Sequence, residues 1–304
     1  MDASYERIGE PTGTEAASSP MSLNSAPLSP VPLSPVIVSV PHAGRDYPLV
    51  LRAALRLPEA SLIVLEDRYV DLVAQEARTV ETMLIQRRAR AWIDLNRSEA
   101  ERDPKVDEGA RPQAQPAQSA KLRSGLGLVP RRAGAAGDLW RRRFSAAEVA
   151  ARITQDHRPY HTALAELLEA ARARFGIAVL IDLHSMPPVG SHAQVVIGDR
   201  FGQAAASRFV ARLEAEAMTM GVRSALNTPY AGGHILERHA APQRNVHAIQ
   251  IEIDRALYLD HALDRPGPGM ARTVAMVRRM LAAVEDEALG GRGTGSGALA
   301  IAAE

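Results

Sequence analysis

The fold is decided by residues 177–185, IAVLIDLHS, where a run of apolar residues ends in polar ones. Two other stretches have the same form, VIVSVPHAG at 36–44 and VHAIQIEID at 246–254. Near-continuous apolar runs of this length are typical of strands buried on both faces of a parallel sheet. In open α/β sheets, ligands bind beyond the carboxyl ends of the strands. The sequence therefore predicts several strands whose ends meet at one site.

Strands and helices are expected to alternate along the chain. The expected strands are 36–40, 82–86, 91–95, 177–183, 195–198, 222–226 and 246–252, and the expected helices are 68–78, one that begins after Ser145, 159–175, 202–219 and 268–286. Ser145 and Glu148 have the spacing of a capping box. Alternating elements predict an α/β fold: a three-layer structure with a largely parallel mixed sheet and helices on both faces.

One folded domain is expected at residues 35–288. Residues 1–34 are rich in Ser, Pro, Ala and Gly, and residues 289–304 are rich in Gly, so both ends are predicted to be disordered. Residues 98–143 show no clean period. A long insertion of this kind is often functional, and we expect a lid or a wall of a substrate channel.

Composition excludes several classes of function. The formal net charge is +1 and aromatic residues make up only 4%, so we expect no nucleic-acid or anionic-membrane partner. The absence of cysteine excludes thiolate sites, and any metal must be held by His, Asp or Glu. No apolar run is long enough for a membrane helix and no signal-peptide pattern begins the chain, so we expect a cytoplasmic protein.

Two histidines stand at predicted strand ends. His42 follows strand 36–40 and is in phase with Val36, Val38 and Val40, so the alternation of a strand would place it just beyond the buried face. Taken alone, His42 is more simply interpreted as a histidine that caps a loop. His184 shares a strand face with Asp182. A polar pair at the end of a buried strand is costly unless it is satisfied, which favours a functional role for His184.

Two charged segments each leave two interpretations open. Residues 66–71, EDRYVD, precede a predicted helix, so their carboxylates fit compensation of the helix dipole as well as metal binding. Residues 94–97, DLNR, close a predicted strand and also fit a simple turn. Arg97 is, however, a natural partner for a substrate carboxylate, because its planar guanidinium can form two hydrogen bonds to such a group.

The third strand end carries a candidate acid/base. Gln250 and Glu252 lie on one face of the predicted strand, and the carboxylate of Glu252 suits general acid/base work. The glycines of YAGGH at 230–234 fit a turn. Histidines, carboxylates and an arginine at strand ends together match a zinc hydrolase site, which has three protein ligands, an open position and a glutamate that is not a ligand.

Six segments also occur in an order that points to one family. They are VSVPHAG at 38–44, EDRYVD at 66–71, DLNR at 94–97, DLHSMP at 182–187, GD at 198–199 and the stretch 227–254, which contains Tyr230, Gly232, Gly233, His239 and HAIQIE at 247–252. This ordered set resembles the N-formylglutamate amidohydrolase family over about residues 36–285.

The resemblance implies a phosphorylase/hydrolase-like α/β fold related to the zinc carboxypeptidases. It also implies a zinc-dependent hydrolase that cleaves N-formyl-L-glutamate to formate and L-glutamate, a step of histidine breakdown. The implied zinc ligands are His42, Asp67 and His184, with Glu66 as the rival carboxylate. Unlike in the carboxypeptidases, Arg45 rather than a glutamate stands three residues after the first histidine.

Within this resemblance, the type and position of other residues suggest their roles around the metal. Glu252 would be the general base toward a zinc-activated water, and Arg97 and Arg255 would bind the substrate carboxylates. Asn96 and Gln250 would contact the substrate, and His234 or His239 would stabilise the oxyanion. Two other functions stay open: an amidohydrolase for another N-acyl amino acid, and a non-catalytic small-molecule binding protein of the same fold.

Overall fold

A computed structural model describes residues 4–9, 32–111, 120–134, 137–188 and 193–290. The predicted disordered tail from 291 onward and most of the predicted disordered N-terminal segment lie outside these residues. Residues 5–8 of that segment instead form a strand, β1, and residues 289 and 290 belong to the last helix. Among the described residues, no helix is both long and apolar enough to cross a membrane.

A seven-stranded mixed sheet forms the centre of the molecule, in the order β1-β3-β2-β4-β7-β5-β6. The strands are β1 (Tyr5–Ile8), β2 (Val36–Val40), β3 (Thr82–Gln86), β4 (Ala178–Met186), β5 (Val195–Gly198), β6 (Ser224–Leu226) and β7 (Val246–Asp254). The four central strands β3, β2, β4 and β7 are parallel, while β1 and β5 run antiparallel to their neighbours β3 and β7. The predicted α/β fold with a largely parallel mixed sheet is confirmed.

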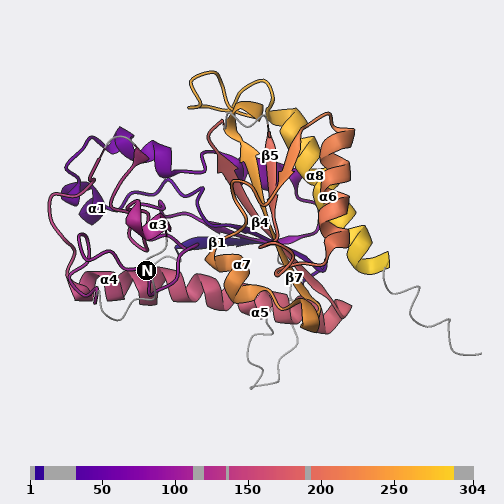
Figure 1. Ribbon diagram of the computed structural model, residues 1–304, viewed down its shortest axis with the longest axis horizontal. Coiled ribbons are helices and arrows are strands. Elements are labelled where there is room, and N and C mark those ends of the chain that lie inside the picture. The colour runs from indigo at the N-terminus through magenta and orange to yellow at the C-terminus, as the bar shows by residue number, and fades with distance from the viewer. Residues whose placement is uncertain (1–3, 10–31, 112–119, 135–136, 189–192, 291–304) are drawn as a thin grey trace, which may run out of the picture.

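Helices cover both faces of the sheet and make three layers (Figure 1). One face packs against α2 (Val70–Ala77), α6 (Ser207–Thr219) and α8 (Met270–Gly290). The other face packs against α5 (Arg158–Phe175), with α1 (Leu49–Ala54), α4 (Ala146–Arg152) and α7 (His234–His239) in the same layer. Shorter elements are α3 (Ala120–Arg123), 3₁₀ turns at Glu59–Leu65, Pro242–Arg244 and Arg255–Leu257, and a π-helical turn at Ile153–His157.

The register of β4 and β7 positions the polar side chains. The two strands pair over nine residues, which sets Asp182 beside Gln250 and His184 beside Glu252. Because successive side chains alternate between faces, Ile249 and Ile251 point to the layer of α6 and α8. The four polar side chains therefore share the opposite face, at the carboxyl ends of both strands.

Residues 91–95 are not a strand, contrary to the prediction. Ala91, Ile93 and Leu95 are fully buried, which explains the strand-like alternation. Their backbone is nevertheless folded into turns, since Trp92 N donates to Ala89 O and Asp94 N donates to Leu128 O. The alternating pattern here reflects a buried loop.

The insertion at 98–143 is anchored to the domain. Where it is described, its side chains Val106, Leu128 and Trp140 are buried in the core beneath α4 and α5. The capping box predicted at Ser145 and Glu148 is present and begins α4 immediately after the insertion. The insertion therefore has a fixed base, and its role as a lid stays a prediction.

Candidate active site

Three candidate metal ligands meet at the ends of β2 and β4. Asp67 Oδ2 lies 2.9 Å from His184 Nδ1 and 3.7 Å from His42 Nδ1. The two imidazole rings stand 4.8 Å apart between centroids. All three side chains are buried, and together they form a cluster that could hold a metal ion.

The outer nitrogens of both histidines are held by carboxylates. His42 Nε2 lies 2.8 Å from Asp94 Oδ1, and His184 Nε2 lies 2.8 Å from Asp182 Oδ2. Metal-binding histidines commonly donate their second N–H to a carboxylate in this way, which fixes the tautomer and the ring orientation. His42 Nδ1 is buried without a hydrogen-bond partner, as expected of a lone pair reserved for a cation. The residues present therefore fit a divalent metal.

The charges of the cluster are strongly coupled. Burial by itself would raise the pKa of Asp67, but the hydrogen bond to His184 and the nearby His42 ring bring that pKa well below its usual range. Burial would lower the pKa of His184, yet Asp182 and Asp67 raise it well above its usual range. The chain alone thus favours a proton on His184 beside an ionised Asp67. A metal cation would compete with that proton.

Asp67 and its rival Glu66 point to different partners. Glu66 accepts a hydrogen bond from the hydroxyl of Tyr47 and a 2.7 Å ion pair from Arg68 Nη1. The Glu66 side chain is buried, and each of its carboxylate oxygens is hydrogen-bonded to one of these partners rather than to the two histidines. The geometry therefore favours Asp67 as the carboxylate of the cluster.

Glu252 stands beside the cluster on β7. Gln250 Nε2 donates to its Oε1 over 3.0 Å, and both residues line the same cavity as His42, Asp67 and His184. Burial raises the pKa of Glu252 to about 7, an effect that the nearby His184 partly opposes. A carboxylate with a pKa near neutrality can both take up and release a proton at physiological pH.

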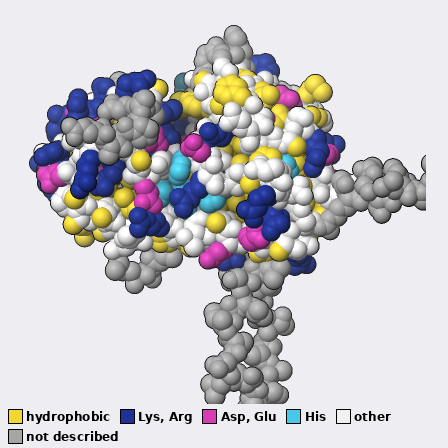
Figure 2. Space-filling model, turned by 60° about the horizontal axis from the view of Figure 1, so that its bottom comes forward, with side chains coloured by type: hydrophobic (Ala, Val, Ile, Leu, Met, Phe, Trp, Pro, Cys, Tyr) yellow, Lys and Arg dark blue, Asp and Glu magenta, His cyan; other side chains and the backbone are white. Residues whose placement is uncertain are grey.

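The cavity over these residues is about 390 Å³ in volume and has a basic lining. Arg90, Arg97, Lys121 and Arg255 all contribute to its wall, together with Tyr230 and the glycines Gly232 and Gly233. Burial lowers the pKa of Lys121, and the neighbouring Arg97 and Arg90 lower it further. Figure 2 shows histidine side chains at the surface of one face of the molecule with basic and acidic side chains around them.

A model of the N-formylglutamate amidohydrolase family matches residues 34–259. The chain belongs to this family. It is therefore an amidohydrolase, as the ordered motifs predicted. The match spans the sheet from β2 to β7 and includes each of the residues of the cluster.

Individual amidohydrolases of this family resemble the chain over most of its length. N-formylglutamate deformylases of Pseudomonas aeruginosa PAO1 and Pseudomonas putida are each 28% identical to it, over 74% of this chain and 82% of the relative. The structure of an N-formylglutamate amidohydrolase from Ralstonia eutropha JMP134 superimposes with a TM-score of 0.78 at 28% identity, covering 96% of this chain and 99% of the other. A gene product of Agrobacterium tumefaciens shares the fold, with a TM-score of 0.54 at 20% identity.

Not every residue assigned to the amidohydrolase site lies there. His239 is buried and bonds His161 over 2.9 Å, and His234 faces a neighbouring cavity. Neither lines the cavity above His184, because α7 directs both side chains toward α5. The structure thus separates these two histidines from the place where an oxyanion would form.

The other assigned side chains line the cavity, although the arginines also have structural partners. Arg97 donates from Nε to Leu126 O and from Nη1 to Asn96 O. Arg255 donates from Nε to Ser185 Oγ over 3.1 Å and reaches Asp67 Oδ1 from Nη2 over 3.3 Å. Asn96 accepts from Ile235 N, so that it joins the amino end of α7 to the site.

Four functional positions were missing from the sequence-based assignment. Asp94 and Asp182 hold the histidines, Arg90 Nε donates to Asp94 Oδ2 over 2.8 Å, and Lys121 reaches the cavity from the insertion. Asp182 shares a strand face with His184, a signal that could have identified its role. No periodicity of apolar residues in the sequence predicts the position of Lys121, because this residue lies on a four-residue helix inside the insertion.

Proposed function

We propose that this chain is a zinc-dependent enzyme that hydrolyses N-formyl-L-glutamate to formate and L-glutamate. The observation that carries the proposal is the convergence of His42 Nδ1, His184 Nδ1 and Asp67 Oδ2 beneath a cavity with a basic lining. The names of the Pseudomonas relatives support the choice of substrate. His42, Asp67 and His184 would hold the metal, which supplies Lewis-acid activation of water and of the formyl carbonyl.

Glu252 is the proton carrier in this proposal. It lies on the strand next to His184 and has a pKa of about 7, so it can accept a proton from the attacking water. It would then give that proton to the glutamate nitrogen as the C–N bond breaks. Gln250, which donates to Glu252 Oε1, keeps the carboxylate turned into the cavity.

The basic lining suits a substrate with two carboxylates. Four cationic side chains surround the cavity, whereas Asp67 and Glu252 are its acidic lining residues. Burial lowers the pKa of Lys121, and the nearby Arg97 and Arg90 lower it further, so an anionic substrate beside these groups would favour their charged forms. We assign Lys121 and Arg90 to the substrate carboxylates alongside Arg97 and Arg255.

Release of the free amine from a panel of N-acyl amino acids tests the proposal. Zinc-loaded protein is expected to cleave N-formyl-L-glutamate faster than N-formyl-L-glutamine, N-acetyl-L-glutamate or N-succinyl-L-glutamate, since only the first combines a formyl group with the two carboxylates of glutamate. Chelation should abolish turnover and zinc should restore it. Faster release of amine from another N-acyl amino acid would identify that compound as the substrate instead. Turnover that is unaffected by chelation would contradict the proposed zinc dependence.

Three finer expectations stay predictions from the sequence. They are a cytoplasmic location, a place in histidine breakdown, and movement of the insertion at 98–143 over the bound substrate. Domain limits at 35 and 288 are likewise predictions.

A further inference from the structure

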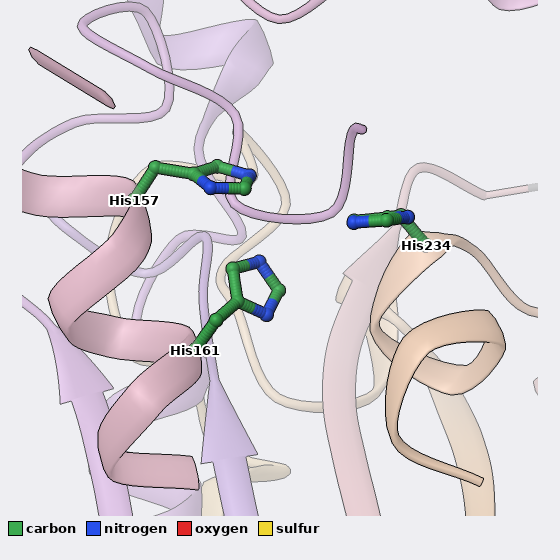
Figure 3. Close-up of side chains that lie close together, drawn as sticks. All are labelled: His157, His161 and His234. Atoms are coloured by element: carbon green, nitrogen blue, oxygen red, sulfur yellow. The ribbon is translucent and has the colours of Figure 1, made fainter. Parts of the chain in front are cut away.

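A second group of histidines lies apart from the candidate active site. His157 and His161 are four residues apart at the start of α5, and His234 begins α7. One ring nitrogen from each of the three lies within 4.8 Å of the others. Figure 3 shows the three rings turned toward one another across the gap between the two helices. We call them the α5–α7 histidines.

The outer nitrogens of two α5–α7 histidines are held by backbone carbonyls. His157 Nε2 lies 2.8 Å from Arg97 O, and His161 Nε2 lies 3.0 Å from Leu95 O. A carbonyl can only accept, so each Nε2 carries the proton and each Nδ1 presents a lone pair. Metal-binding histidines are oriented by such bonds. The arrangement thus provides two ligands with fixed tautomers.

The inner nitrogens lack the partners that buried polar atoms normally have. His157 is fully buried and its Nδ1 has no hydrogen bond, and neither ring nitrogen of His234 has one. Buried polar atoms without partners are rare and call for a ligand or a bound ion. At His161 the Nδ1 faces His239 Nε2 at 2.9 Å, so an ion would replace this contact between two side chains.

The electrostatic surroundings keep the α5–α7 histidines neutral. Burial lowers the pKa of His157, His161 and His234. Neighbouring histidines lower the pKa of His157 and His161 further, whereas Glu237, 3.7 Å from His234 Nδ1, partly opposes the effect of burial on His234. The nearest carboxylates are already engaged or exposed: Glu99 Oε1 is 3.8 Å from His157 Nδ1 and pairs with Arg158, and Glu237 is exposed. Neutral imidazole is the form that binds a metal.

We propose that His157, His161 and His234 bind a second divalent transition metal, separate from the metal of the active site. Three neutral imidazoles suit Zn²⁺, Co²⁺, Ni²⁺ or Cu²⁺, whereas Mg²⁺ and Ca²⁺ prefer oxygen ligands. Zinc–nitrogen bonds of about 2.0–2.1 Å require the nitrogens to approach to roughly 3.3 Å, a closure of about 1.5 Å at most. A cavity of about 400 Å³ that His234 lines gives the ion a path from solvent.

The bound metal is assigned a structural role. It would join α5 to α7, and its ligands already hold the carbonyls of Leu95 and Arg97. Asn96 lies between these two residues and contacts Gln250 and α7. An ion that binds only the folded chain stabilises it in proportion to its occupancy. We therefore expect the second metal to raise the melting temperature and to brace one wall of the active site.

Metal stoichiometry tests this second site without relying on activity. Protein incubated with excess zinc and then passed through a desalting column is expected to retain two zinc ions per chain. Asp67→Asn should retain one, His234→Ala should retain one, and the double variant should retain none. The control His261→Ala removes an exposed histidine outside both clusters and should retain two.

Cobalt identifies which site is filled. In the Asp67→Asn chain one Co²⁺ should bind with visible ligand-field absorption, and the second equivalent of metal should raise the melting temperature of the intact chain. Wild-type protein that retains a single zinc, lost in Asp67→Asn and kept in His234→Ala, overturns the proposal. So does an Asp67→Asn chain that binds no cobalt, or a second zinc that survives in folded His234→Ala. Because the Asp67→Asn chain should keep the second metal, failure of the proposed enzymatic function would be seen separately.

Discussion

Two clusters of histidines in this molecule, one at the strand ends and one between α5 and α7, differ in their outer partners. Around His42 and His184 the second ring nitrogens meet carboxylates, and Asp67 stands among the ligands. Around His157 and His161 they meet backbone carbonyls instead. Accordingly the pKa of His184 is raised by its carboxylates in spite of burial, whereas burial lowers the pKa of His161.

The difference teaches that the surroundings, more than the residue type, decide what a buried histidine can do. Carboxylates around the first cluster raise the basicity of its ligands and allow a cation with a reactive open position. Carbonyls around the α5–α7 histidines orient the rings without adding negative charge. The first cluster is therefore suited to catalysis and the second to holding helices together.

The largest effect is expected from the carboxylate of the first cluster. Asp67→Ala should remove the active-site zinc and lower kcat/KM by about 1,000-fold or more, because Lewis-acid stabilisation is worth several kcal/mol. Elemental analysis and formate release measure the two effects. Glu66→Gln is the matched control: Glu66 is bonded to Tyr47 and Arg68, so zinc should stay and only stability should fall. If Glu66→Gln lost the zinc and Asp67→Ala retained it, Glu66 rather than Asp67 would be the metal ligand.

A smaller but still large effect is expected at Glu252. Glu252→Gln should retain zinc and lose about 10²–10⁴-fold in kcat, because general acid/base catalysis is removed while the ligands are untouched. Steady-state kinetics on zinc-loaded protein provide the measurement. An unchanged kcat would assign the proton transfer to another group and would leave the metal proposal standing.

The outer carboxylates give the most direct test of the contrast between clusters. Asp182→Asn should weaken zinc binding at the first cluster by about 10–100-fold, since it removes the charge that orients His184. Competition with a zinc-binding dye measures the affinity. Binding at the α5–α7 histidines should be unchanged in the same variant, because carbonyls orient those rings. Equal loss at both places would show that the clusters are not independent.

The smallest expected effect is the dependence of rate on pH. Glu252 must be ionised to accept a proton, and its pKa without a metal is about 7, so activity should rise with pH along an acid limb. A bound cation favours the ionised form, so the midpoint should lie below 7 in zinc-loaded protein. A pH–rate profile measures this limb. A rate that increases on acidification through the same range would rule out Glu252 as the base.

Much of the fold could be predicted because its central strands are apolar on both faces. β4 and β7 stand out as continuous runs, and a period of two is enough to place Asp182, His184 and Glu252 at one edge. β1 could not be predicted, since Tyr5–Ile8 is a short edge strand that pairs with β3, more than seventy residues away in the chain. Residues 91–95 imitate a strand because their apolar side chains Ala91, Ile93 and Leu95 are buried, while the backbone hydrogen bonds lead into loops.

The hydrophobic pattern alone predicted the candidate site only where the site lies at strand ends. His42 and His184 follow from strand ends, whereas Lys121 comes from the short helix α3 and Arg90 from a turn, and the positions of both depend on tertiary packing. His234 was assigned to stabilise the oxyanion from its residue type and its position in the sequence. Its actual neighbours on α5 lie more than seventy positions earlier in the chain, and no local pattern connects them.

The pairing of β4 with β7 ties the chemistry of this molecule to its core. His184 faces Glu252 only while Ile181 lies opposite Ile249, because all these pairs belong to one ladder. Insertion of a single residue into either strand would turn its polar side chains toward α6 and α8 and its isoleucines or leucines toward the cavity. Substitutions at these positions can therefore tune the enzyme one side chain at a time, whereas a change of length in β4 or β7 would abolish catalysis and packing together.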